Sequence, residues 1–226
     1  MDIRSPESGP PSCSRVVLAR HGETDSNQRR IILGHGSDPL TEDGRAQARQ
    51  LGRAIAKYPL TAAYCSDLPR AIETATLALE GRDIKPQPVE GLRELNWGAL
   101  EGLSVYLLED ETPADHGRVP RVGRGQQIPH PVAPPGGETL LEGLERFVGA
   151  VEGIAARHCG ESVLIVTHNM LMRAWLSQIL RWPLDRCWDI MITFCAHCVL
   201  DVSPGQACIA DLGSIRFDAR ARGWPP

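Results

Sequence analysis

Apolar and polar residues alternate in blocks along this chain, and the blocks have the lengths of short strands and amphipathic helices. Two continuous apolar runs, residues 16–19 and 163–166, are short and rich in β-branched side chains, so each predicts a buried strand. Between residues 138 and 158, large apolar residues recur at three- and four-residue spacing, which predicts an amphipathic helix. Strands that alternate with helices in this way indicate an α/β fold of three layers, α/β/α, with a mainly parallel sheet.

The remaining blocks give the other expected elements. Thr41 is a favourable N-cap followed by acidic residues, so we expect a helix from there to about Tyr58, where Pro59 ends it. Pro69 suits the first turn of a further helix, which runs to about residue 79. We also expect a polar loop at 22–40, a strand at 62–66, an extended segment at 87–103, helices at 104–110 and 169–181, and an antiparallel pair of strands at 190–194 and 197–202.

The chain of 226 residues suits one domain, which we place at residues 15–213. Residues 1–14 are rich in proline, serine and glycine and are predicted to be disordered, and residues 214–226 are predicted to form an irregular tail. Residues 111–136 hold six prolines, four glycines and three arginines. A loop of this length is usually a functional lid or a disordered segment, and we favour a lid or substrate cap.

The composition of the chain limits the kinds of partner and the cellular location that we expect. The net charge of −4 argues against nucleic acid or an anionic membrane as the main partner. No apolar run reaches the roughly 18 residues of a membrane span, and residues 1–14 lack the apolar core of a signal peptide. Seven cysteines without regular spacing favour a reducing cytoplasm. Cys195, His197 and Cys198 lie in an apolar segment and no second Cys/His pair has zinc-finger spacing, so no metal site is predicted.

Two of the predicted strands end on histidines. The first delivers Arg20 and His21 to its carboxyl end, and the second ends on His168. A single histidine after a strand is more often a turn or packing residue. However, ligands of open α/β sheets bind at the carboxyl ends of the strands, so two such histidines suggest one site with two imidazoles.

The stretch ARHGETDSN, residues 19–27, resembles the signature of the histidine phosphatase superfamily, also called phosphoglycerate mutase-like. The resemblance covers roughly residues 15–202 and keeps the order of the family's motifs. It implies a phosphoglycerate mutase-like fold and a phosphomonoesterase that acts on a small phosphorylated metabolite. The other matching segments are Pro39-Leu40-Thr41, residues 66–74 (SDLPRAIET), Leu92-Arg93-Glu94, Gly137-Glu138 and Thr167-His168.

The resemblance also implies roles for single residues. His21 would attack phosphorus and become phosphohistidine, and Glu94 would give a proton to the leaving oxygen. Because arginine and histidine side chains would neutralise the phosphoryl group, no metal or other cofactor is required. Arg20, Arg70 and His168 would form the phosphate pocket, with Asn27, Thr24 and Asn169 as further substrate contacts, and Glu138 would orient His21 or its loop, or cap the following helix.

The chain departs from the family pattern at several positions, which leaves alternatives open. Leu33-Gly34 stands where many relatives carry Gln-Gly, and Asn169-Met170 where many carry Gly-Gly, so the pocket for the organic part of the substrate is expected to differ. Leu95 and Trp97 replace the arginine and tyrosine that follow the glutamate in phosphoglycerate mutases. A mutase and a catalytically idle phosphate-binding module are the alternative functions, and a homodimer is compatible with the sequence.

Overall fold

A six-stranded sheet forms the centre of the computed structural model, which describes residues 13–104 and 132–217. Its strand order is β3-β2-β4-β1-β6-β7; the first four strands are parallel, and β6 and β7 are antiparallel to their neighbours. The prediction of a mainly parallel sheet is therefore confirmed. The strands are β1 (Ser14–Arg20), β2 (Leu60–Ser66), β3 (Pro86–Val89), β4 (Ser162–Thr167), β6 (His197–Ser203) and β7 (Gln206–Asp211).

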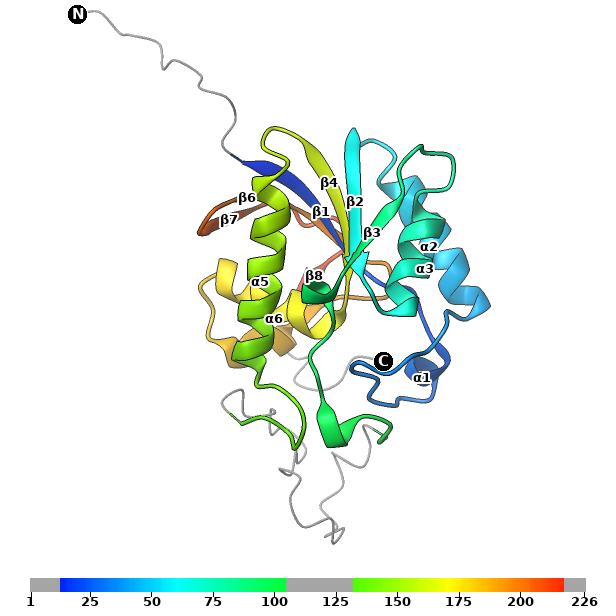
Figure 1. Cartoon of the computed structure of the whole chain (residues 1–226), viewed down its shortest axis with the longest axis vertical. Coiled ribbons are helices and arrows are strands. Elements are labelled where there is room, and N and C mark those ends of the chain that lie inside the picture. The colour runs from blue at the N-terminus through cyan, green and yellow to red at the C-terminus, as the bar shows by residue number, and fades with distance from the viewer. Residues whose placement is uncertain (1–12, 105–131, 218–226) are drawn as a thin grey trace, which may run out of the picture.

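Helices cover both faces of this sheet (Figure 1). Successive side chains of a strand point to opposite faces, so Val16 and Leu18 of β1 pack in one apolar cluster and Val17 and Ala19 in another. The first cluster includes residues of two helices and the second those of two others, which makes three layers. The helices are α5 (Leu140–Ala156) and α6 (Asn169–Ile179) on one face, and α2 (Glu42–Ala54) and α3 (Pro69–Ala78) on the other.

Two of the helix starts lie where the sequence predicted them, and a third is capped by a residue that was not predicted. The Thr41 hydroxyl accepts a hydrogen bond from the amide of Gly44 at 2.9 Å and begins α2, which ends at Ala54, before the expected Tyr58. Pro69 lies in the first turn of α3 as predicted. Thr139 caps α5 through a capping box.

The predicted antiparallel pair near the carboxyl end of the chain was wrong. β5 (Ile190–Met191) pairs with β8 (Arg216–Phe217) in a separate two-stranded sheet, whereas β6 pairs with β1 and β7. The chain turns at Cys195, where φ is 56°, and then enters the main sheet beside β1. Short apolar runs indicate strands but do not identify their partners, and β7 was not predicted at all.

Smaller elements fill the regions expected as loops. α1 (Asp25–Gln28) lies inside the predicted polar loop, and β3 begins the predicted extended segment as an edge strand, where its prolines are tolerated. The residues expected to begin an irregular tail contain β8. Within residues 13–104 and 132–217, the 3₁₀ turns are η1 (Glu90–Leu92), η2 (Gly98–Leu100) and η3 (Leu184–Asp189).

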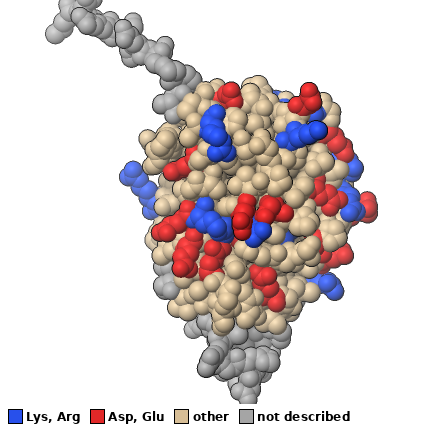
Figure 2. All heavy atoms as spheres, viewed as in Figure 1, with Lys and Arg blue, Asp and Glu red and all other residues tan. Residues whose placement is uncertain are grey.

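Several expectations concern parts of the chain outside the described residues. These parts include almost all of the segment expected to be disordered, the helix expected at 104–110 apart from Ser104, and most of the segment expected as a lid. Of that segment only residues 132–136 are described. Among the described helices, none is both long and apolar enough to cross a membrane. On the face shown in Figure 2, acidic and basic side chains are interspersed.

Candidate active site

The carboxyl ends of β1 and β4 bring the two predicted histidines together. The strands are parallel neighbours with Arg20 opposite Thr167, so His21 and His168 leave the sheet at the same edge. The backbone amide of His21 donates to the carbonyl of Thr167 at 2.9 Å, which fixes this register. The two imidazole centroids lie 5.1 Å apart, and the predicted pair of imidazoles in one site is thereby observed.

His21 has one ring nitrogen in a hydrogen bond, and its surroundings favour the neutral form of the ring. Its Nδ1 lies 2.7 Å from the carbonyl oxygen of Gly22. A carbonyl oxygen can only accept a hydrogen bond, so Nδ1 carries the proton and the lone pair of the neutral ring lies on Nε2. Burial lowers the pKa of His21 well below its usual value, and the charges of Arg70 and Arg20 lower it further. The ring is therefore neutral near pH 7, and its Nε2 lone pair is not protonated.

His168 is fully buried beside the same charges. Burial, followed by the charge of Arg70, lowers the pKa of His168 well below its usual value. Neither of its ring nitrogens has a hydrogen-bond partner among the described residues. Because a buried polar group without a partner is costly, this ring is suited to hydrogen-bond a bound group at the site.

Two buried arginines surround the histidines. Arg70 donates through its two terminal nitrogens to the carbonyls of Gly36 at 2.9 Å and Gly34 at 2.7 Å. Arg20 donates to the carbonyl of Ile192 at 2.6 Å. Burial lowers the pKa of Arg20 to about 9 and that of Arg70 to about 10, so both remain charged at pH 7. The Nε of each lacks a partner among the described residues, which leaves a donor for an anion.

Glu94 lines the same cavity and is held by the backbone. One carboxylate oxygen accepts a hydrogen bond from the amide of Leu95 at 2.9 Å, and the other from the amide of Met170 at 3.1 Å. The carboxyl group is therefore buried and fixed in direction. The cavity is lined by Arg20, His21, Asn27, Ile31, Ile32, Leu33, Gly34, Arg70, Glu94, Trp97, Asn169, Met170 and Trp188.

The expected substrate contacts occupy different places. Asn27 and Asn169 line the cavity, and Asn169 Oδ1 has no partner among the described residues. Thr24 is fully buried and is not part of the cavity lining. Its hydroxyl donates to Asn27 Oδ1 at 3.0 Å and caps α1, so Thr24 fixes the orientation of Asn27.

Glu138 was expected to orient His21 or its loop, or to cap the following helix. The capping role is wrong, because Thr139 is the N-cap of α5. Instead, its carboxylate accepts hydrogen bonds from the amide of Asn96 at 2.8 Å and from Arg146 at 2.5 Å. Arg146 also donates to the carbonyl of Glu94 at 3.2 Å. Glu138 and Arg146 thus hold the segment that carries Glu94.

Sequence reasoning missed other residues of the site. Trp188 lines the cavity from η3, and no periodic or motif signal pointed to it. Arg173 of α6 is buried, has two unpartnered nitrogens among the described residues, and lies with its guanidinium 5.5 Å from the Trp188 ring centroid. The sequence did hold one signal for Arg173. It is a charged residue within an apolar helix that directly follows His168, so its burial near that histidine could have been expected.

The arrangement suits a phosphoryl group. Arg20, Arg70, Glu94 and the neutral imidazole of His21 line one cavity, and the neutral imidazole of His168 lies beside that of His21. Such preorganised charge stabilises the negative oxygens of a transferring phosphoryl group. Among the described residues there is no group of three or more His, Cys, Asp or Glu side chains that could hold a metal ion.

Residues 16–214 match the family model of the histidine phosphatase superfamily, branch 1. The chain belongs to this superfamily. The matched range covers most of the chain and contains every residue of the candidate site described above. Solved structures of similar proteins share the overall fold of this chain.

Three relatives illustrate the likeness. The chain is 29% identical over 200 residues to the adenosylcobalamin/alpha-ribazole phosphatase of Salmonella typhimurium, with 88% of this chain and 96% of the relative covered. It is 32% identical to the 2,3-bisphosphoglycerate-dependent phosphoglycerate mutase 2 of Gloeobacter violaceus, with 80% and 82% covered. The structure of Bacillus stearothermophilus YhfR matches with a TM-score of 0.77 and 33% identity, and 93% and 100% of the two chains are covered.

Proposed function

We propose that this protein is a phosphomonoesterase that hydrolyses a small phosphorylated metabolite through a phosphohistidine intermediate on His21. One observation carries the proposal: Nδ1 of His21 is held by the Gly22 carbonyl, so the lone pair of Nε2 is available in a cavity lined by Arg20, Arg70 and Glu94. A nucleophile, two cations and a proton donor are the groups that phosphoryl transfer to water requires.

The proposed reaction has two steps. In the first, His21 Nε2 attacks phosphorus, the bond from phosphorus to the ester oxygen breaks, and Glu94 gives its proton to that oxygen. In the second, a water molecule loses a proton to the Glu94 carboxylate and attacks phosphorus, the P–N bond breaks, and inorganic phosphate leaves. Arg20, Arg70 and His168 bind the non-bridging oxygens in both steps, which supplies the charge without a metal or cofactor.

The relatives' names include both phosphatases and phosphoglycerate mutases, so the choice between the two activities rests on this chain's own residues. Phosphatases occur among them, as does a mutase at 32% identity. Leu95 and Trp97, which follow the proton donor, are both buried, and Leu95 carries no charge to hold a second anionic group. An idle phosphate-binding module would not need Glu94 opposite His21.

We also place the enzyme in a reducing cytoplasm, with all seven cysteines as free thiols, and without a nucleic-acid partner.

The deciding experiment traps the intermediate. On rapid mixing with a radiolabelled phosphomonoester, the enzyme should acquire an acid-labile, alkali-stable label, as expected of a phosphohistidine. His21→Asn should keep the fold and abolish both label and turnover. His158→Asn is the matched control, because His158 bonds to Tyr64 and Glu161 outside the cavity lining and should leave both unchanged. A normal label on His21→Asn would exclude His21 as the nucleophile.

A further inference from the structure

An apolar pocket adjoins the cavity that holds His21 and Glu94. The two share Trp97, Met170 and Trp188, so one opens beside the other. Most of the other side chains that line the second pocket are aliphatic, and Leu140 and Leu184 are among them. The second pocket belongs to no step of the phosphoryl transfer described above.

The proton donor connects the two spaces. The two amides that hold the Glu94 carboxylate belong to Leu95 and Met170, and the side chains of these same residues line the apolar pocket. Glu94 must lie next to the leaving oxygen of the ester when it gives up its proton. The organic group attached to that oxygen therefore begins beside Leu95 and Met170.

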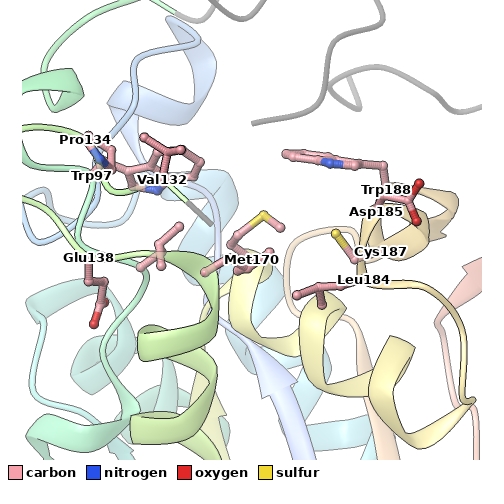
Figure 3. Close-up of a pocket in the computed structure, with 11 residues that line it drawn as sticks. Trp97, Val132, Pro134, Glu138, Met170, Leu184, Asp185, Cys187 and Trp188 are labelled. Carbon is pink, nitrogen blue, oxygen red and sulfur yellow. The ribbon is translucent and has the colours of Figure 1, made fainter. Parts of the chain in front are cut away.

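Two tryptophans bound this pocket. Figure 3 shows Trp97 and Trp188 on opposite sides, with Met170 below and between them. Both indoles are almost completely buried, and the guanidinium of Arg173 lies 5.5 Å from the ring centroid of Trp188. Indole rings and a methionine side chain make favourable contacts with a flat aromatic group.

The charges around the pocket disfavour an anion. None of the described residues that line it is basic, and two of them, Glu138 and Asp185, are acidic. The Glu138 carboxylate is paired with Arg146, and in Figure 3 it points away from the space between the tryptophans. Asp185 is exposed at the rim and would repel a second carboxylate or phosphate on the substrate.

We propose that this pocket binds the organic part of the substrate and selects monoesters of uncharged aromatic alcohols over esters that carry a further negative charge. The proposal rests on the proposed function, because it takes Glu94 as the group that protonates the leaving oxygen. Specificity then comes from the side chains of Leu184, Trp97 and Trp188, whereas the phosphate contacts are common to all substrates.

Three esters test the selection. Benzyl phosphate and ethyl phosphate release alcohols of similar acidity, so the ratio of their kcat/KM values reports binding of the organic group rather than leaving-group chemistry. We expect benzyl phosphate to be favoured roughly 10- to 100-fold, the range set by burying an apolar ring. We expect 3-phosphoglycerate to be hydrolysed more slowly than ethyl phosphate.

Variants at Leu184 assign the preference to the pocket. Leu184 lines the apolar pocket but not the phosphate cavity, and it is half-buried. Leu184→Ala should lower the benzyl-to-ethyl ratio about 3- to 10-fold through lost apolar contact. Leu184→Lys should lower it further and raise relative turnover of 3-phosphoglycerate. Leu141→Lys is the control, because Leu141 is 46% exposed on α5 and lies outside both linings.

The outcomes separate the two proposals. If no ester is hydrolysed and no phosphoenzyme forms, the proposed function fails. If all three esters are hydrolysed with similar kcat/KM values, or if the Leu184 variants keep the wild-type ratio while folded, the enzyme is a phosphatase and the aromatic pocket is refuted. Circular dichroism of each variant establishes that it is folded, and ethyl phosphate turnover establishes that its phosphate site is intact.

Discussion

The imidazole rings of His21 and His168 lie with their centroids 5.1 Å apart and their planes at 58° to each other. Both are buried, and burial together with the charges of Arg70 and Arg20 lowers the pKa of each. Two neutral rings therefore sit between two cations near pH 7. In the proposed mechanism, the Nε2 lone pair of His21 is the one that attacks phosphorus, and the neutral state of both rings keeps the total positive charge of the site small.

The buried histidines should make stability depend on pH. A histidine with a lowered folded pKa is neutral in both states above its unfolded pKa of about 6.5, and below that value only the unfolded state gains the proton. Stability is thus full above about pH 6.5 and is lost as the pH falls towards the folded pKa. Between pH 7.5 and 5.5, we expect each histidine to contribute a loss of about 1.4 kcal/mol.

Urea unfolding at the two pH values measures this effect. His168→Gln removes one of the two histidines, so its loss of unfolding free energy on acidification should be smaller than that of the wild type by about 1.4 kcal/mol. His158→Gln serves as control because His158 is hydrogen-bonded to Tyr64 and Glu161, away from the site. An identical pH dependence for the wild type and His168→Gln would show that His168 is not held neutral.

Glu94→Gln should separate esters by their leaving groups. The amide is nearly isosteric and can still accept one backbone hydrogen bond, but it cannot protonate the ester oxygen. We expect kcat for ethyl phosphate to fall about 10²- to 10⁴-fold and kcat for p-nitrophenyl phosphate to fall much less, because nitrophenolate leaves without a proton. Equal losses for the two esters would assign Glu94 a positional role.

Arg70 should not be replaceable by lysine. Its two terminal nitrogens donate to two different carbonyls, those of Gly34 and Gly36, and a lysine ammonium on a flexible chain cannot reproduce this planar fork. We expect Arg70→Lys to lower kcat/KM about 10- to 100-fold for all esters alike, since each loses the same phosphate contact. Arg49→Lys, an exposed pair with Glu80, should have no effect. An effect confined to some esters would contradict the assignment.

Much of the fold followed from local patterns. Buried parallel strands such as β4 are continuous apolar runs, so they could be predicted from the sequence. Helices such as α2 could also be predicted, because their capping residues lie within the first turn. Strand partners were not, because pairing depends on which edge is available after the chain has folded. β7 alternates exposed and half-buried residues on an edge of the sheet, and its weak pattern gave no prediction.

The residues of the candidate site could be predicted from the sequence only where they lie in motifs of the family. His21, Arg20, Arg70, Glu94 and His168 were named and converge as expected. Trp188 and Arg173 were not, because their positions depend on how η3 packs against α6. Glu138 was expected to orient His21 or its loop, or to cap the helix; the capping role was wrong because Thr139 is the cap, and the Glu138 carboxylate reaches the segment of Glu94.

Glu138 should therefore act through Glu94. Removing its carboxylate frees the Asn96 amide and leaves Arg146 without its closest partner. We expect Glu138→Ala to slow ethyl phosphate about 10-fold and p-nitrophenyl phosphate less, the same selectivity as loss of Glu94 but weaker. Glu142→Ala, in the first turn of α5, is the control: it removes a capping contact and should lower stability by about 1 kcal/mol without changing that ratio. Equal slowing of both esters by Glu138→Ala would make its role merely structural.

The segment after the proton donor sets the balance between hydrolysis and mutase activity. A mutase must retain an anionic product while phosphohistidine persists, and this retention requires a cation near the leaving group. In this protein the residue directly after Glu94 is Leu95, which is almost fully buried and uncharged. Among the described residues, no basic side chain lines the adjoining pocket. A charge-assisted hydrogen bond lost there corresponds to about 1.5–3 kcal/mol, which is more than tenfold in retention of the product.

We therefore expect phosphate release, not isomerisation. The enzyme is incubated with 3-phosphoglycerate and a trace of 2,3-bisphosphoglycerate, and both 2-phosphoglycerate and inorganic phosphate are followed over time. Because the dephosphorylated product has no clamp near Leu95, it should leave before water attacks His21-bound phosphate, so inorganic phosphate should accumulate and 2-phosphoglycerate should stay below a tenth of it. A phosphoglycerate mutase assayed in parallel serves as the positive control. Formation of 2-phosphoglycerate that outpaces phosphate release from every ester tested would overturn the assignment.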